Sequence, residues 1–217
     1  MSDTVRTRLL VAAPLAVEAF ALRSAGAGVR VVRTGMGPRR SERAAQRLAR
    51  EPADAVAVAG VCGALDEAFE PGDLVVASAL VGPDGARIAL EGAGLVAALT
   101  RAGLCVHLGA IASVARLADG RNRGELARRT GACAVDMESF WLAGSAAARP
   151  FAVLRAVSDG PRHEFWRPAI VTQGIAALRS LREAAPVLAA WAAEACAASA
   201  SLPPVSVSAP ALSRALA

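Results

Sequence analysis

The sequence predicts a three-layer α/β domain, in which helices cover both faces of a central, twisted, mixed β-sheet. Short apolar runs of strand length recur along the chain and alternate with segments of helical character. These runs are apolar throughout, as is typical of strands that are buried on both faces. The 217 residues are enough for one such domain with a sizeable core. We therefore expect a single domain over residues 1–199 and a mobile, Ser-, Pro- and Ala-rich tail over 200–217.

Proline and glycine mark the expected element boundaries. Pro14 and Pro186 are expected to begin the first and the last helix, because proline suits the first helical turn. The Gly-rich segment 60–65 is expected to be a turn after the third strand. The expected strands cover residues 8–13, 29–34, 55–59, 74–79, 87–90, 106–113, 133–135 and 151–157. The expected helices cover residues 15–24, 39–50, 94–102, 122–130, 139–148, 169–182 and 186–198.

Charge and hydropathy argue against two classes of partner. The formal net charge is +5, but the basic residues are all arginines, are spread along the chain and form no run with interleaved aromatics. This pattern does not favour a nucleic-acid interface. No apolar run approaches the roughly 20 residues that span a membrane, and the N-terminus lacks a secretory signal. We expect a cytoplasmic protein without stable membrane insertion.

The cysteines do not suggest a metal site. Cys62, Cys105, Cys133 and Cys196 form no CxxC pair, and the chain has only two histidines. A structural zinc site is therefore not expected. Buried free thiols are expected instead, and we predict neither a metal nor another cofactor.

Three carboxylates are candidates for chemistry, because a carboxylate near buried strands usually has a partner or a function. Asp159 follows Ser158 at the end of an apolar strand, where either residue could instead cap the next helix. Glu138 begins a helix, whose macrodipole favours a negative charge there. Glu18 lies among apolar residues on a helix, but it could face solvent. Residue type alone leaves these alternatives open.

Two glycine motifs could bring backbone close to a ligand. Gly35 and Gly37 precede a helix, and Gly60 and Gly63 follow a strand. Such glycines can leave backbone N–H groups free for an anion or a ligand oxygen. An ordinary strand-to-helix turn is the alternative for the first motif.

The order of the motifs points to a family. The segments AAPLAVEA, TGMGP, AGVCGALDEAFEPGDLVVAS, IAS, AVDMES and RAVSD follow one another along the chain. Together they resemble the superfamily of purine nucleoside phosphorylases and nucleosidases over residues 9–159. The resemblance is strongest to the nucleosidase branch that acts on methylthioadenosine and S-adenosylhomocysteine.

The resemblance implies a role for each candidate. Asp159 would hydrogen-bond or protonate N7 of a purine, with support from Ser158. Glu138 would bind the ribose hydroxyls, and Met137 would pack against the sugar. Glu18 would activate a water molecule. The glycines Gly35, Gly37, Gly60 and Gly63 would line the ribose and nucleophile side. Because cleavage of a ribosyl C–N bond passes through an oxocarbenium-like state, we expect a protonated Asp159 and an ionised Glu138.

Several positions depart from the family pattern. Residues 114–117 are Val-Ala-Arg-Leu, where the nucleosidases carry Gly-Asp and then a Phe that stacks on the base. Val61 replaces the usual serine, and residues 56–59 lack the phosphate-binding Arg of hexameric phosphorylases. Because that Arg is missing and Glu18 is present, water is the expected nucleophile. Arg39 and Arg40 keep open a phosphorylase with phosphate as co-substrate, and the departures also permit a nucleoside-binding protein without catalysis.

The expected substrate is a purine nucleoside, with adenine as the base and a 5′ substituent. Phe140, Trp141, Phe165 and Trp166 could line a pocket for that substituent, or they could belong to the core or a subunit interface. The superfamily includes futalosine hydrolases and enzymes of hopanoid biosynthesis, and the composition suits the hopanoid type. His163 could assist in its loop, although a surface role is the alternative. The resemblance also implies a homodimer.

Overall fold

The structure is a computed structural model that describes residues 7–116, 120–160 and 169–201. The described strands are β1 (Leu9–Ala13), β2 (Val29–Arg33), β3 (Ala55–Ala64), β4 (Leu74–Val81), β5 (Arg87–Ala89), β6 (Val106–Ser113), β7 (Ala134–Asp136) and β8 (Phe151–Asp159). The described helices are α1 (Ala16–Leu22), α2 (Pro38–Leu48), α3 (Ala93–Arg101), α4 (Gly120–Thr130), α5 (Ser139–Leu142) and α6 (Ala169–Ser201), with 3-10 turns η1 (Arg23–Ala25) and η2 (Ala143–Ser145). Nearly all of the tail predicted over 200–217 lies outside the described residues.

One mixed sheet contains all the described strands. Its order is β2-β1-β3-β7-β6-β4-β5, and β8 pairs with both β3 and β4. The pairings of β3 with β8 and of β4 with β6 are parallel, whereas β3–β7 and β4–β8 are antiparallel. The strands β3, β8, β4, β6 and β7 thereby close into a ring. Because Gly63 pairs with Val135 on one side and with Asp159 on the other, the ends of β3, β7 and β8 lie together.

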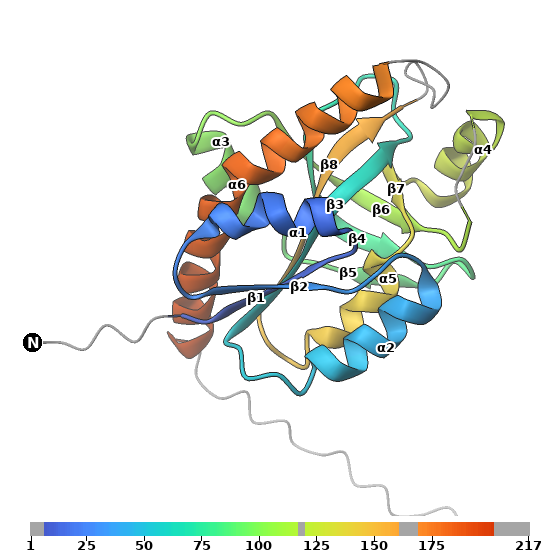
Figure 1. The fold of residues 1–217 in the computed structure, drawn as a ribbon. Coiled ribbons are helices and arrows are strands. Elements are labelled where there is room, and N and C mark those ends of the chain that lie inside the picture. The colour runs from blue at the N-terminus through green and yellow to red at the C-terminus, as the bar shows by residue number, and fades with distance from the viewer. Residues whose placement is uncertain (1–6, 117–119, 161–168, 202–217) are drawn as a thin grey trace, which may run out of the picture.

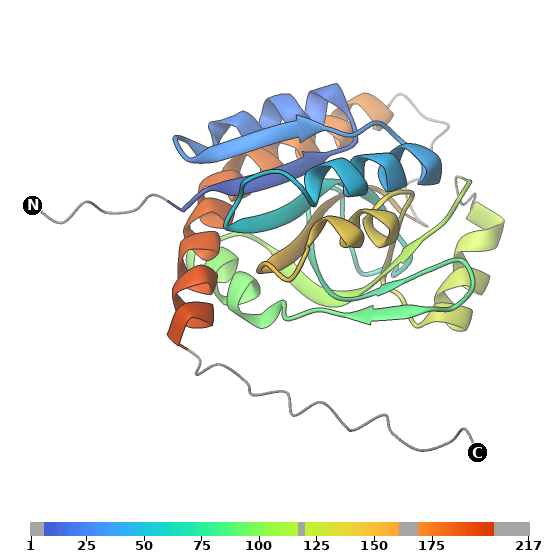
Figure 2. The ribbon, with the colours of Figure 1, turned by 90° about the horizontal axis from the view of Figure 1, so that it is seen from below.

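Helices cover the sheet on two sides, which confirms the predicted three-layer class. In both views α1 lies beside α6, and α2 lies beside α5 (Figures 1 and 2). Along β1, Leu9 and Val11 belong to the core with α1, α3 and α6, whereas Leu10 and Ala12 belong to the core with α2 and α5. This alternation explains why the strands are apolar on both faces. No helix of the described residues is long and apolar enough to cross a membrane.

Helix α6 differs from the prediction of two helices, because it continues through Pro186. Proline has no N–H to donate to the carbonyl four residues earlier, which here belongs to Arg182. The hydroxyl of Ser24 lies 3.0 Å from that carbonyl oxygen and 3.0 Å from the carbonyl oxygen of Ala21, so its single proton is shared between the two acceptors. This tertiary contact stands in for the lost helical bond, and the helix continues with a bend between its orange and red halves (Figure 1).

Two further predictions are corrected. The Gly-rich segment 60–65 is not a turn at its start, because β3 continues to Ala64 with a bulge between Cys62 and Gly63. The helix expected over 139–148 ends early, in α5 and η2, because Ala147 and Ala148 adopt left-handed φ values of 46° and 63°.

The thiols are less buried than the sequence predicts. Cys62 is buried, but Cys133 and Cys196 are only partly buried and Cys105 is exposed. All four are free. The prediction of buried thiols is therefore wrong for Cys105, which lies just before β6 at the surface.

Candidate active site

A cavity of about 570 Å³ lies where the ends of β3, β7 and β8 meet. Its volume is that of a small-molecule site. Among the predicted site residues, Glu18, Gly63, Met137, Glu138, Ser158 and Asp159 all line it. The fold thus brings three carboxylates, from α1, from the turn after β7 and from the end of β8, to one hollow.

Glu18 is a buried carboxylate, with 1% of its surface exposed, so the solvent-facing alternative does not hold. Its Oε2 accepts the backbone N–H of Leu15 at 2.6 Å, and its Oε1 accepts that of Val61 at 2.8 Å. These two bonds fix the side chain between the start of α1 and β3. Burial raises the pKa of Glu18, and the nearby Arg155 guanidinium opposes the rise.

Asp136 organises the turn that presents Glu138. Its Oδ1 accepts the hydroxyl of Ser113 at 2.6 Å and the backbone N–H groups of Glu138 and Ser139 at 3.2 Å each. Glu138 itself accepts the N–H of Gly37 at 3.1 Å and makes no side-chain cap of α5. Burial raises the pKa of Glu138, whereas Arg155 and the Gly37 N–H favour its anion.

Arg155 is a central residue that the sequence reasoning missed. It lies in β8 with no exposed surface, and its Nη2 lies 2.7 Å from Asp136 Oδ2 and 3.6 Å from Glu138 Oε2. Burial alone would lower the pKa of Arg155, but the carboxylates of Asp136, Glu138 and Glu18 raise it. A buried cation is rare without partners, so an arginine inside the apolar run FAVLRAV was the available signal.

Gly63 lines the cavity, but the other predicted glycines, Gly35, Gly37 and Gly60, are not among its lining residues. Gly60 pairs with Arg155 in the sheet, and a Cβ on Gly60 would lie 2.6 Å from Arg155 Nη1 and 2.7 Å from Glu18 Oε1. Gly60 therefore provides the space in which the two side chains meet. Gly35 has a left-handed φ of 85°, and a Cβ there would lie 2.8 Å from Arg40 Cδ.

Asp159 is the last residue of β8, and 4% of its surface is exposed. Two side chains contact its carboxylate. The hydroxyl of Ser158 donates to its Oδ1 at 2.9 Å, and Nη2 of Arg123 on α4 donates to its Oδ2. Nη1 of Arg123 also donates to the carbonyl of Ala64 at 3.1 Å. The Ser158 hydroxyl also lies 3.1 Å from the carbonyl oxygen of Cys62, so its single proton is shared between the two acceptors. A ligand atom that is to contact Asp159 Oδ2 must displace Arg123.

Arg123 closes a small hollow of about 30 Å³ beside the main cavity, which Val114 and Asp159 also line. No motif pointed to Arg123, because it is one of several arginines in the segment RNRGELARR. Val114, where the departure from the family pattern begins, thus lines the same small hollow as Asp159. Leu117 lies outside the described residues.

The aromatic candidates do not line the cavity in the described part of the chain. Phe140 packs against the core on the α2 and α5 side, and its ring meets that of Trp141 edge-on at 6.2 Å. Of the two alternatives for the aromatic residues, a place in the core therefore applies to Phe140. His163, Phe165 and Trp166 lie outside the described residues.

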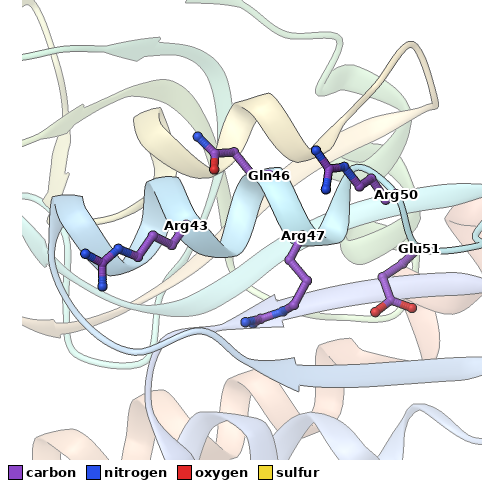
Figure 3. A pocket seen from close by; sticks show the side chains of 5 residues that line it. All are labelled: Arg43, Gln46, Arg47, Arg50 and Glu51. Carbon is purple, nitrogen blue, oxygen red and sulfur yellow. The ribbon is translucent and has the colours of Figure 1, made fainter.

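A second hollow follows α2 and is lined by Arg43, Gln46, Arg47, Arg50 and Glu51 (Figure 3). Its arginine side chains point in different directions rather than toward one point (Figure 3). Glu51 is moreover paired with Arg30 at 2.6 Å. The hollow is therefore an exposed helix surface and not a convergent anion site.

The fold is an α/β sandwich with a cavity that carboxylates from strand ends and from a helix line. The chain belongs to the phosphorylase superfamily, whose sequence model matches residues 12–180. It is thus an enzyme of the nucleosidase and nucleoside phosphorylase type. A comparison with curated proteins gave no match.

Solved structures share the fold over most of their length. A 5'-methylthioadenosine/S-adenosyl homocysteine nucleosidase from Campylobacter jejuni superposes with a TM-score of 0.74 at 16% identity, covering 87% of this chain and 99% of that one. The futalosine hydrolase of Helicobacter pylori gives a TM-score of 0.72 at 19% identity, with 87% and 98% covered. A 5'-methylthioadenosine/S-adenosylhomocysteine nucleosidase from Neisseria meningitidis, in complex with methylthio-immucillin-A, gives 0.69 at 22%, with 85% and 98% covered. At these identities the likeness concerns the fold.

Proposed function

We propose that this chain is a nucleosidase that uses water to cleave the N-glycosidic bond of a purine nucleoside with a 5′ substituent. The observation that carries the proposal is the convergence of Glu18, Glu138 and Asp159 on one cavity. Cleavage through an oxocarbenium-like state needs an acid for the leaving group and carboxylates for water and sugar. The three carboxylates can supply these functions.

Glu18 is the proposed general base. A base works best when its pKa approaches the working pH, and burial raises the pKa of Glu18 in that direction. The two backbone N–H groups that it accepts, from Leu15 and Val61, hold the carboxylate in place while it takes a proton from water. Arg155 favours its anion, so the base remains available.

Glu138 and Met137 are the proposed sugar contacts. Glu138 is held toward the cavity by the Gly37 N–H and by the turn that Asp136 organises. An anion in this position accepts ribose hydroxyls and favours the positive charge that develops on the sugar.

Asp159 is the proposed acid for the purine. It must exchange the contact with Arg123 for one with the base, and we propose that the entering purine displaces the guanidinium. Ser158, which donates to Asp159, would then keep the carboxyl oriented.

The lining of the cavity favours water over phosphate. None of its described lining residues is basic, and neither Arg39 nor Arg40 belongs to them. A phosphate dianion would need such cations. Phosphorolysis, with phosphate as co-substrate, and nucleoside binding without catalysis remain the alternatives to be tested.

We propose adenine as the base and an apolar 5′ substituent, with hopanoid biosynthesis as a candidate context. Leu15, Met36 and Val61 form apolar parts of the cavity lining, which supports an apolar substituent. The relatives' names are also consistent with substituted nucleosides, since two of them act on methylthioadenosine and S-adenosylhomocysteine.

The first experiment is an assay of free base from methylthioadenosine, adenosine and inosine, with and without phosphate. Release without phosphate is expected, and release only with phosphate would move the chain to the phosphorylases. Asp159→Asn should abolish release while nucleoside binding survives, and Asp66→Asn, at an exposed aspartate outside the cavity, should behave as the wild type. Normal turnover by Asp159→Asn would contradict the assignment of the acid. If no nucleoside yields base but adenine raises the Tm, binding without catalysis is favoured.

A cytoplasmic homodimer is part of the proposal. On α1, Val17 and Phe20 are 55% and 73% exposed, and on the adjacent α6 Ile175 is 59% exposed. Large apolar side chains gathered in this way suit a partner surface, and we propose a second copy of the chain as that partner. Light scattering should show a dimer, and Phe20→Glu should shift it toward the monomer. A monomeric wild type would refute the dimer.

A further inference from the structure

Three different metal-ligand side chains meet outside the cavity, at the starts of β4 and β6. Asp73, Cys105 and His107 place one carboxylate oxygen, one sulfur and one ring nitrogen within 4.8 Å of one another. His107 Nε2 lies 3.3 Å from Asp73 Oδ2 and 3.8 Å from Cys105 Sγ. None of the three lines the cavity described above.

The strand register explains the meeting. Strands β4 and β6 are parallel, with Leu74 paired to Val106, so the preceding residues Asp73 and Cys105 are neighbours. The backbone N–H of Leu74 also donates to the carbonyl of Cys105 at 3.0 Å. Cys105 and His107 are two residues apart along the chain, so their side chains lie on the same face of the sheet at the start of β6.

Other residues hold these side chains in place. The ring of Phe69 stacks on the His107 imidazole, with centroids 4.2 Å apart and planes at 20°. Asp73 Oδ2 accepts the backbone N–H of Glu70 at 3.0 Å. Such outer contacts orient ligands and strengthen metal sites.

The spacing of the donor atoms agrees with a tetrahedral ion. Bonds of about 2.0 Å to N and O and about 2.3 Å to S, at tetrahedral angles, separate N from O by roughly 3.3 Å and N from S by roughly 3.5 Å. The structure has 3.3 Å and 3.8 Å for these separations, so an ion fits after a small movement of the thiol.

We propose that Asp73, Cys105 and His107 form a zinc site, with water completing the coordination. Sulfur, imidazole and carboxylate together favour Zn²⁺ over Mg²⁺ or Ca²⁺, which prefer oxygen ligands. The carbonyl of Asp73 accepts the N–H of Val157, two residues before Asp159, at 2.8 Å. The ion would therefore join β4 and β6 beside β8 and stabilise the fold. The proposal does not depend on the reaction that the cavity catalyses.

The test uses the full chain, freed of any affinity tag and treated with a chelator. Calorimetric titration with Zn²⁺ should show one ion per chain, and the Tm should rise with Zn²⁺ but not with Mg²⁺. Co²⁺ should give a sulfur-to-metal charge-transfer band. Cys105→Ser should remove this band and weaken Zn²⁺ binding by more than roughly tenfold, since even outer contacts contribute about that much.

The matched control is Cys196→Ser, which changes a free, partly buried thiol outside the cluster. It should bind Zn²⁺ and Co²⁺ as the wild type does. Equal loss in both cysteine variants would overturn the proposal, as would the absence of saturable one-to-one binding or a charge-transfer band that persists in Cys105→Ser. Unchanged Tm values in chelator would show that both variants fold.

Discussion

Arg123 on α4 donates a hydrogen bond to the carboxylate of Asp159 at the end of β8. The residue proposed to protonate the leaving base is thus held by a buried cation from another part of the chain. The pair links α4 to the strand end that lines the cavity. If an entering purine displaces Arg123 as proposed, substrate entry and the release of Arg123 are coupled.

Removal of this cation should change substrate affinity. In Arg123→Met no guanidinium has to be displaced from Asp159 when a purine enters, so we expect a lower KM for the nucleoside in steady-state kinetics. Arg128→Met, which changes an exposed arginine on the same helix, should keep the wild-type KM. An unchanged or raised KM in Arg123→Met would contradict the proposed displacement.

Glu18→Gln should lower the activity and also change how the free energy of unfolding depends on pH. Loss of a general base lowers kcat by roughly 10²- to 10⁴-fold. The pKa of Glu18 is raised in the folded protein, so its protonation stabilises the fold at low pH, and this stability is lost as the pH rises above the usual glutamate range. From pH 5 to 8, the free energy of unfolding of the wild type should therefore fall relative to that of the variant.

Urea denaturation at several pH values measures this difference. Glu194→Gln, at an exposed position on α6, should show no such divergence. Parallel pH curves for the wild type and Glu18→Gln would contradict the burial of a titrating Glu18.

Arg155→Met should destabilise the fold strongly. It leaves Asp136 and Glu138 buried without their cation, and breaking such a buried pair typically costs about 3–5 kcal/mol. Urea denaturation should show this loss, whereas Arg179→Met, which breaks an exposed pair with Glu183, should change little. A fall of less than about 1 kcal/mol would mean that Arg155 is not the partner on which these carboxylates depend.

Gly60→Ala should disturb the same site by steric overlap alone, because it adds no charge and no hydrogen-bonding group. The new Cβ would overlap Arg155 Nη1 and Glu18 Oε1, and such overpacking costs about 1–3 kcal/mol. We expect lower kcat and a lower Tm. Gly94→Ala in α3 meets open space, so this control should instead stabilise the helix by roughly 0.5–1 kcal/mol. Equal effects of the two substitutions would contradict the crowding at Gly60.

Local sequence properties predicted the strands and the site carboxylates, but not their partners. The apolar run of β8 and the motif AVDMES placed Asp159 and Glu138 at element ends. The extent of β3 was not predictable, because Gly60 and Gly63 indicate a turn unless the side chains that occupy their space are known. Pro186 likewise indicated a helix start, since the hydroxyl that replaces its missing bond comes from the distant Ser24.

The sequence by itself determined the fold class and the family, because periodicity and motif order are properties of neighbouring residues. It also identified three carboxylates as candidates for chemistry. Only the tertiary structure decided which cations face them, Arg155 between Asp136 and Glu138 and Arg123 on Asp159. It likewise brought Asp73 to Cys105 and His107. These contacts depend on strand register and on closure of the sheet, which join residues that are far apart in the chain.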